Sequence, residues 1–174
     1  MLLNISLVLF DRDGTLNKRN VNGYVMTKSD LHFPPDIDTL RHLNYVNVGI
    51  VTNQSCIGRG LVTFDQVSSL THSMRDKFSS SSRFDVFICP HVPDDECECR
   101  KPHSGLIKQA LQFFGVPPSN TLLVGDSISD LEAAQECCVP FRAVCWDSKC
   151  WSADCLHSLS NVVNLVNISQ QKKD

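Results

Sequence analysis

The sequence has no apolar stretch near the roughly 20 residues that a membrane-spanning helix requires. With a formal net charge of −3, it also lacks the basic excess of proteins that bind nucleic acid or anionic membranes. Only 8 glycines and 8 prolines occur in 174 residues, which excludes a collagen-like or disordered chain. The sequence shows no apolar seam that would indicate a dimer with a second copy of the chain. We therefore expect a soluble monomer with neither nucleic acid nor a membrane as partner.

A secretion signal is also missing. The apolar residues before Asp11 have no basic residue ahead of them and run directly into charge, which favours a buried strand over a signal peptide. Nine cysteines would suggest a disulfide scaffold in a short secreted chain, but their number is odd and most show no paired spacing. We expect a reduced, cytoplasmic protein in which some cysteines bind a metal.

Apolar runs of strand length alternate with stretches of helical period, which predicts a Rossmann-like α/β domain with a mainly parallel sheet. Residues 1–168 are expected to form this single domain, with no large cap, and residues 169–174 a polar tail. The expected strands are Leu3–Phe10, Val48–Thr52, Phe84–Cys89, Thr121–Val124 and Phe141–Cys145. The expected helices are Asp36–Tyr45, Thr63–Phe78, Ser104–Phe114 and Ser129–Cys137.

Carboxylates follow the first and fourth of these strands, and ligands of open α/β sheets bind beyond the carboxyl ends of strands. Asp11 and Asp13 could bind a divalent cation and still present one oxygen as a nucleophile. Asp126 could complete the cation site with Asp11, and Asp130 could orient its loop. The alternatives are a surface turn over residues 11–14 and a helix-dipole role for Asp130.

Two further polar groups could bind a phosphate. The segment Thr52–Ser55, at the end of the second strand, offers a hydroxyl and backbone N–H groups to phosphate oxygens. Lys101 beside the carboxylates would reduce their repulsion and stabilise charge on a transferring phosphoryl group. Taken alone, each group has a simpler alternative, namely a polar loop and an exposed basic pair of Arg100 and Lys101.

Three cysteines and one histidine gather in a loop at residues 89–99. They are Cys89, His91, Cys97 and Cys99. Three thiolates and an imidazole match a closed tetrahedral zinc site, which has no open position to activate water. The zinc would be structural and would fix the loop just before Arg100 and Lys101. An iron–sulfur cluster fits less well because one ligand is histidine, and scattered free cysteines are the remaining alternative.

The order of these groups resembles the haloacid dehalogenase superfamily of aspartate-nucleophile phosphatases. The pattern is Asp-x-Asp-Gly-Thr at residues 11–15, then Thr52, then Lys101, then Gly-Asp-x-x-x-Asp at residues 125–130. The cysteine–histidine loop and the stretch around Arg59 further resemble its zinc-containing branch. Members of that branch act on D-glycero-D-manno-heptose 1,7-bisphosphate or on histidinol phosphate.

The resemblance implies Mg²⁺-dependent hydrolysis of a phosphate monoester. Asp11 would attack phosphorus to form an aspartyl-phosphate, and Asp13 would protonate the leaving oxygen and then activate water. Thr52 and Lys101 would bind the phosphoryl oxygens. Mg²⁺ would be held by the Asp11 carboxylate, the Asp13 main-chain carbonyl and the Asp126 carboxylate. The cofactors implied are therefore Mg²⁺ in the active site and Zn²⁺ in the loop.

The substrate is then a small phosphorylated molecule. The stretches Gly58–Gly60 and Asn17–Tyr24 resemble the heptose bisphosphate enzymes, which favours removal of the 7-phosphate, with Arg59 and Arg100 on the second phosphate or the sugar. Asn53 and Ser55 are further candidates for substrate binding. The short metal loop resembles the histidinol-phosphate phosphatases instead, which favours histidinol phosphate.

Two positions depart from the superfamily pattern, and two other functions stay open. Cys56 stands where a glycine is usual, and Ser127 where a basic residue commonly contacts phosphate. A polynucleotide 3′-phosphatase shares part of the pattern, although the net charge and the cysteine loop count against it. A non-catalytic zinc-stapled binding domain is the other alternative, and the complete set of catalytic residue types counts against it.

Overall fold

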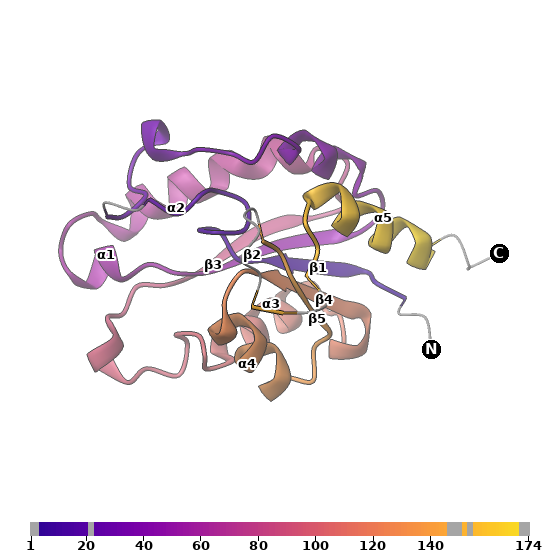
Figure 1. Ribbon diagram of the computed structural model, residues 1–174. Helices are drawn as coiled ribbons and strands as arrows, with labels where there is room; N and C mark the ends of the chain where they lie inside the picture. Colours follow the sequence, from indigo (N-terminus) through magenta and orange to yellow (C-terminus); the bar gives the residue numbers. More distant parts are fainter. Residues whose placement is uncertain (1–3, 21–22, 146–150, 153–154, 171–174) are drawn as a thin grey trace.

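A parallel sheet with helices on both faces forms the protein (Figure 1). The computed structural model describes residues 4–20, 23–145, 151–152 and 155–170. Five strands follow the order β3-β2-β1-β4-β5 and all pair in parallel. They are β1 (Leu7–Phe10), β2 (Asn47–Asn53), β3 (Phe84–Cys89), β4 (Thr121–Gly125) and β5 (Phe141–Ala143). The predicted α/β class is confirmed.

The helices differ from the expectation in several places. The α-helices are α1 (Ser55–Gly58), α2 (Phe64–His72), α3 (Gly105–Phe114), α4 (Ile128–Glu136) and α5 (Leu159–Gln170). The 3₁₀ helices are η1 (Lys28–Asp30), η2 (Ile37–His42), η3 (Ser73–Phe78), η4 (Pro93–Asp95) and η5 (Pro118–Asn120). Among the described residues, no helix is long and apolar enough to cross a membrane.

Two of the differences concern expected helices. The expected helix at residues 36–45 is the 3₁₀ helix η2, because its buried residues Ile37 and Leu40 and the buried Leu43 just after it recur every three positions. The expected helix at residues 63–78 begins as predicted, since the Thr63 hydroxyl accepts the Gln66 amide, but it continues as η3 after residue 72. Helix α5 was not expected, and it runs to residue 170, beyond the expected end of the domain.

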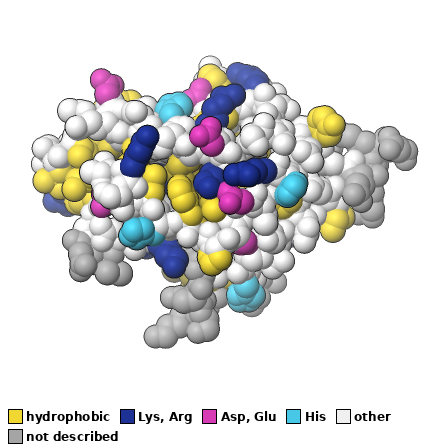
Figure 2. Space-filling model, turned by 90° about the horizontal axis from the view of Figure 1, so that it is seen from above, with side chains coloured by type: hydrophobic (Ala, Val, Ile, Leu, Met, Phe, Trp, Pro, Cys, Tyr) yellow, Lys and Arg dark blue, Asp and Glu magenta, His cyan; other side chains and the backbone are white. Residues whose placement is uncertain are grey.

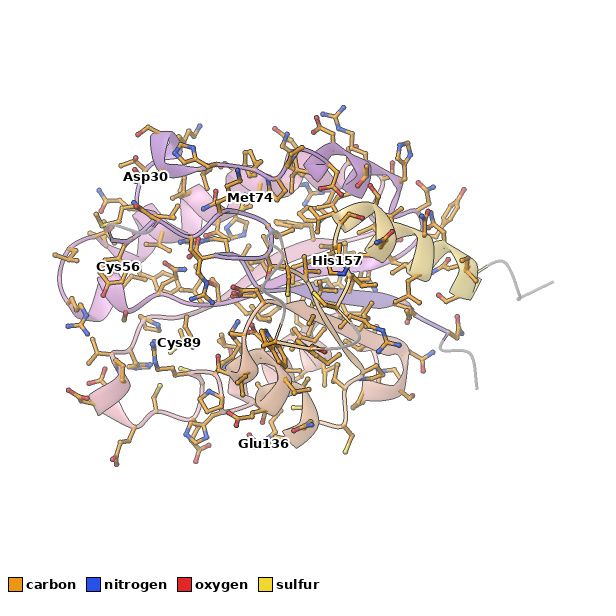
Figure 3. The ribbon with its side chains drawn as sticks, viewed as in Figure 1. Asp30, Cys56, Met74, Cys89, Glu136 and His157 are labelled. Atoms are coloured by element: carbon orange, nitrogen blue, oxygen red, sulfur yellow. The ribbon has the colours of Figure 1, made fainter. Side chains whose placement is uncertain are left out.

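The apolar core lies on both faces of the sheet. In β1, Val8 and Phe10 join a cluster that includes buried residues of η2 and α5, whereas Leu7 and Leu9 join a cluster with residues of α3 and α4. Figure 1 shows α2 and α5 on one side of the sheet and α3 and α4 on the other, and side chains fill the space between the layers (Figure 3). Burial on both faces explains why these strands read as continuous apolar runs.

The order of the strands reverses at β1, which lies between β2 and β4. Phe10 pairs with Ile50 on one side and with Val124 on the other. The carboxyl ends of three strands therefore meet at one edge of the sheet. Such a reversal is where open α/β sheets bind ligands.

The expectation of a wholly reduced chain is wrong for two cysteines, since Cys145 and Cys155 are disulfide-bonded. The chain folds back after β5, where the Cys145 amide donates to the Leu156 carbonyl (3.2 Å) and the Leu156 amide donates to Ala143 (2.7 Å). These backbone contacts form only in the folded chain, so the spacing of the cysteines in the sequence did not reveal that Cys145 and Cys155 are disulfide-bonded. Cys150 lies outside the described residues.

The face seen in Figure 2 carries basic and acidic side chains close to one another. On η2 and η3, both Lys77 and Arg41 pair with Asp38, at 2.8 and 3.3 Å. Exposed pairs of this kind contribute little to stability.

Candidate active site

Asp11 follows β1 directly and faces a buried lysine. The Asp11 amide donates to the Val124 carbonyl (2.9 Å), which fixes the backbone between the strand ends. Lys101 Nζ lies 2.7 Å from Asp11 Oδ1 and 2.6 Å from Asp130 Oδ1, and it donates to the Val51 carbonyl at 2.9 Å. One ammonium thus joins two buried carboxylates and the end of β2.

Burial and charge act against each other in this cluster. Burial raises the pKa of Asp11 to about 7, although the Lys101 ammonium opposes the rise; the carboxylates of Asp130 and Asp126 add to it. Burial alone would lower the pKa of Lys101, but Asp11 and Asp130 raise it, so the ammonium stays charged at neutral pH. Burial also raises the pKa of Asp126, although the hydrogen bond and the charge of the neighbouring Arg19 oppose the rise. A cation beside Asp11 would favour its carboxylate form.

Asp11, Asp126 and Asp130 each bring a ligand oxygen within 4.8 Å of the others. The loop after β1 closes tightly over Asp126, because Gly14 has φ +101° and a Cβ atom there would overlap the Asp126 carboxylate. Only glycine fits this position. Clustered carboxylate oxygens at this edge fit a hard divalent cation. The structure thus brings together Asp11 and Asp126 as predicted, and it adds Asp130 to the cluster.

The Asp13 side chain turns toward a buried arginine. Arg12 Nη2 and Gln54 Nε2 each lie 2.8 Å from Asp13 Oδ2, and Arg12 Nη2 also donates to Gln54 Oε1 at 2.8 Å. Arg12 is fully buried and donates further to Thr71 Oγ1 and the Val25 carbonyl, both at 3.1 Å. The orientation of Asp13 is therefore set by a network that crosses to α2.

The end of β2 holds residues for which we predicted contact with substrate. Thr52 Oγ1 accepts a hydrogen bond from Gln54 Nε2 (2.8 Å) and is buried. Asn53 bonds the Lys101 main chain in both directions, since its Nδ2 donates to the carbonyl (2.9 Å) and its Oδ1 accepts from the amide (3.0 Å). Asn53 therefore positions Lys101, a role that the sequence reasoning did not include.

Two hollows open beside these residues. A hollow of about 220 Å³ is lined by Asp11, Arg19, Asn53, Arg100, Lys101, Ser127, Ser129 and Asp130. A second, of about 160 Å³, is lined by Asp13, Arg19, Asn20, Gly23, Tyr24, Val25, Asn53 and Gln54. Ser55 Oγ lies 3.4 Å from the Tyr24 hydroxyl at the rim of the second hollow. Arg59 is exposed at the end of α1 and lines neither hollow.

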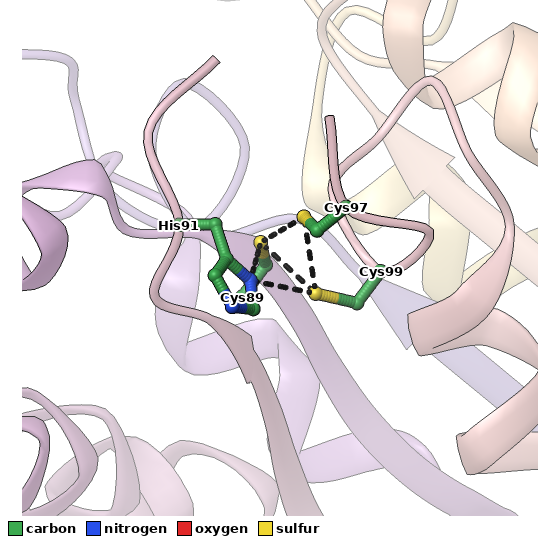
Figure 4. A group of neighbouring side chains, drawn as sticks. All are labelled: Cys89, His91, Cys97 and Cys99. Carbon is green, nitrogen blue, oxygen red and sulfur yellow. Dashed lines mark hydrogen bonds between the residues drawn. The ribbon is translucent and has the colours of Figure 1, made fainter. Parts of the chain in front are cut away.

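The predicted zinc ligands converge after β3 (Figure 4). Cys99 Sγ lies 3.2 Å from Cys89 Sγ, 3.5 Å from Cys97 Sγ and 3.2 Å from His91 Nδ1. Cys89 Sγ lies 3.7 Å from Cys97 Sγ and 3.6 Å from His91 Nδ1. Zinc–sulfur bonds of about 2.3 Å give a tetrahedron with edges of about 3.8 Å, so the four side chains fit this ion. Arg100 Nη1 donates to the His91 carbonyl (3.0 Å) and ties the cluster to the active site.

Four residues reach the site without having been predicted. Arg12 and Gln54 contact Asp13, as given above. Arg19 Nε lies 2.8 Å from Asp126 Oδ2, and Trp151 Nε1 donates to the Asp126 carbonyl (2.8 Å). Arg12 stands between two carboxylates in the sequence, which is a weak signal. The contacts of Arg19 and Trp151 depend on segments that meet only in the folded chain.

Residues 36–144 match the family of haloacid dehalogenase-like hydrolases. The chain belongs to this family. It is 38% identical over 141 residues to a Thermoplasma volcanium protein named "Probable D-glycero-D-manno-heptose-1,7-bisphosphate 7-phosphatase", covering 78% of this chain and 95% of the relative. It is 32% identical to D-glycero-beta-D-manno-heptose-1,7-bisphosphate 7-phosphatase of Haemophilus ducreyi, covering 92% and 97%.

A solved structure shares the fold over nearly the whole chain. It is the D,D-heptose 1,7-bisphosphate phosphatase from B. bronchiseptica, complexed with magnesium and phosphate. The TM-score is 0.78 at 23% identity, over 94% of this chain and 99% of the other. The family assignment inferred from the motifs is thereby confirmed, and the relatives are named phosphatases.

Proposed function

We propose that this protein is a Mg²⁺-dependent phosphatase that removes the 7-phosphate from D-glycero-D-manno-heptose 1,7-bisphosphate. The observation that carries the proposal is the position of Asp11, between Lys101 and Asp126 at the reversal of the strand order. The names of the relatives support the heptose substrate, and they include both the beta and the alpha anomer. The anomer is therefore left to the experiment.

The reaction divides into two displacements. A carboxylate oxygen of Asp11 attacks phosphorus while the bond between phosphorus and the C7 oxygen breaks, and Asp13 gives its proton to the leaving oxygen. Asp13 then takes a proton from water, whose oxygen attacks the aspartyl-phosphate to release phosphate and restore Asp11. Lys101 and the Thr52 hydroxyl bind the phosphoryl oxygens. Most of this catalysis is positioning and neutralisation of charge.

Two metals complete the proposal. Mg²⁺ would be held by the Asp11 and Asp126 carboxylates and the Asp13 main-chain carbonyl, and it would neutralise charge between the nucleophile and an anionic ester. Zn²⁺ would be held by the cluster at residues 89–99, where all four positions belong to the protein, so its role is structural. The cytoplasmic location, the monomeric state and the lack of a nucleic-acid partner stay predictions.

Histidinol phosphate is the second candidate substrate, because only five residues separate His91 from Cys97 in the metal loop. Phosphate release with Mg²⁺ should be measured from both substrates, from each heptose anomer and from a 3′-phosphorylated oligonucleotide. We expect kcat/KM for one heptose anomer to exceed that for histidinol phosphate by about 100-fold, which is about 2.7 kcal/mol of transition-state binding.

The controls separate the chemistry from the substrate. Asp11→Asn should abolish release, whereas Asp38→Asn, at an exposed surface pair, should match the wild type. A preference for histidinol phosphate would transfer the assignment to that substrate. No release from any substrate by the wild type with both metals present would overturn the phosphatase proposal.

A further inference from the structure

Arg19 forms an ion pair with Asp126 that the proposed mechanism does not use. Its Nε lies 2.8 Å from Asp126 Oδ2 and its Nη2 lies 3.1 Å from Oδ1, so the guanidinium binds both carboxylate oxygens. The Arg19 side chain is 60% exposed and that of Asp126 only 16%. Exposed pairs contribute little to stability, so folding alone does not account for this one.

The place of Arg19 distinguishes it from the other cations of the site. Lys101 is buried and already bonded to two carboxylates and a carbonyl. Arg100 donates to the His91 carbonyl of the cysteine loop. Arg19 lines both hollows, the one that contains Asp11 and the one that contains Asp13, and it can turn without disturbing the core.

On the basis of the proposed function, we propose that Arg19 is a substrate-binding residue. Its guanidinium would leave the Asp126 carboxylate and pair with the phosphoryl group of the substrate. Because Arg19 contacts both oxygens of the Asp126 carboxylate, a divalent cation that binds there competes with the guanidinium for the charge of that carboxylate. Once displaced, the guanidinium would lie beside Asp11, and its planar fork matches two phosphate oxygens. Ser127, next to Asp126, supplies no cation there, so the loop after β1 provides it instead.

The exchange predicts opposite effects on two ligands. Calorimetry should follow Mg²⁺ alone, and then inorganic phosphate at saturating Mg²⁺, in the wild type and in Arg19→Gln. We expect Arg19→Gln to bind Mg²⁺ at least threefold more tightly, since no guanidinium competes, and phosphate about tenfold more weakly. Arg19→Lys keeps the charge without the fork and should bind phosphate with intermediate affinity. Arg41→Gln, at an exposed pair with Asp38, should match the wild type in both titrations.

The failures of this inference and of the proposed function are distinguishable. If the wild type binds Mg²⁺ and phosphate and hydrolyses the substrate, but Arg19→Gln matches it in either affinity, only the exchange is overturned. If the wild type binds neither ligand, both proposals fail. A thermal midpoint of Arg19→Gln equal to that of Arg41→Gln would show that the changed affinities do not come from unfolding.

Discussion

Lys101 holds two buried carboxylates, and its charge should be the largest electrostatic contribution to the stability of the site. Its side chain is 3% exposed, that of Asp130 is fully buried, and the ammonium contacts Asp11 and Asp130 at 2.7 and 2.6 Å. Lys101→Met keeps the length of the side chain but leaves the carboxylates without a counter-ion. One of them must then be protonated in the folded state.

The cost of that protonation depends on pH. Burial already raises the pKa of Asp11 to about 7 in the wild type, and loss of the Lys101 ammonium removes the group that opposes this rise. Above pH 7 the folded variant therefore holds one more proton than the wild type, so its loss of stability should grow as pH rises from 7 to 9. At about 1.36 kcal/mol per pKa unit, the loss should grow by up to about 2.7 kcal/mol over these two pH units.

Urea unfolding at pH 7 and at pH 9, without added Mg²⁺, measures this loss. Lys108→Met removes an exposed lysine that lies 3.1 Å from Glu136, and it should leave the stability nearly unchanged at either pH. If Lys101→Met fails to fold at pH 7, the double variant Lys101→Met with Asp130→Asn should restore folding, since it removes one of the two carboxylates. A loss that does not grow between pH 7 and pH 9 would refute the reasoning.

Three further predictions concern the surroundings of the site. Gln54→Leu removes the amide that donates to Asp13 and should lower kcat about tenfold. If kcat is unchanged, Gln54 does not position Asp13. Removal of zinc by a chelator, or Cys97→Ser, should lower the thermal midpoint and activity together, and an unchanged midpoint would contradict a structural metal. The Met26 and Thr27 amides hold the pKa of Asp30 below its usual range, so Asp30→Asn should lower the midpoint at pH 7. Because the folded-state pKa is lowered, that difference should shrink as pH falls below the ordinary pKa of 3.8 and the wild-type carboxylate is protonated, and a difference that did not shrink would exclude this cause.

The sequence allowed the sheet and the position of Asp11 to be predicted for one physical reason. Parallel strands buried on both faces read as continuous apolar runs, and their carboxyl ends meet at one edge. Polar groups that follow such runs, such as Asp11, Thr52 and Asp126, are therefore brought together by the register alone. The cysteine loop was predictable as well, because its ligands lie within eleven residues of the sequence.

What could not be predicted depends on contacts between distant segments. The bonds of Arg12 to Gln54 and of Arg19 to Asp126 join residues 42 and 107 positions apart, and no local pattern marks them. Helix α5 has weak helical patterning, and its buried valines pack against the core only once the sheet has formed. Its neighbour η2 takes a tighter helical form because its apolar period is three.

Few bonds connect the cysteine loop to Asp11, so under the proposed function the loop is a determinant of catalysis. Arg100 donates to the His91 carbonyl, and the next residue, Lys101, is fixed through its main chain by the Asn53 amide. Its ammonium then meets Asp11 at 2.7 Å. A buried ammonium between two carboxylates tolerates little displacement, because each charge left unpaired there is costly. Under the proposed function, a metal with no open coordination position would therefore affect phosphoryl transfer without touching the substrate, by fixing where Lys101 lies.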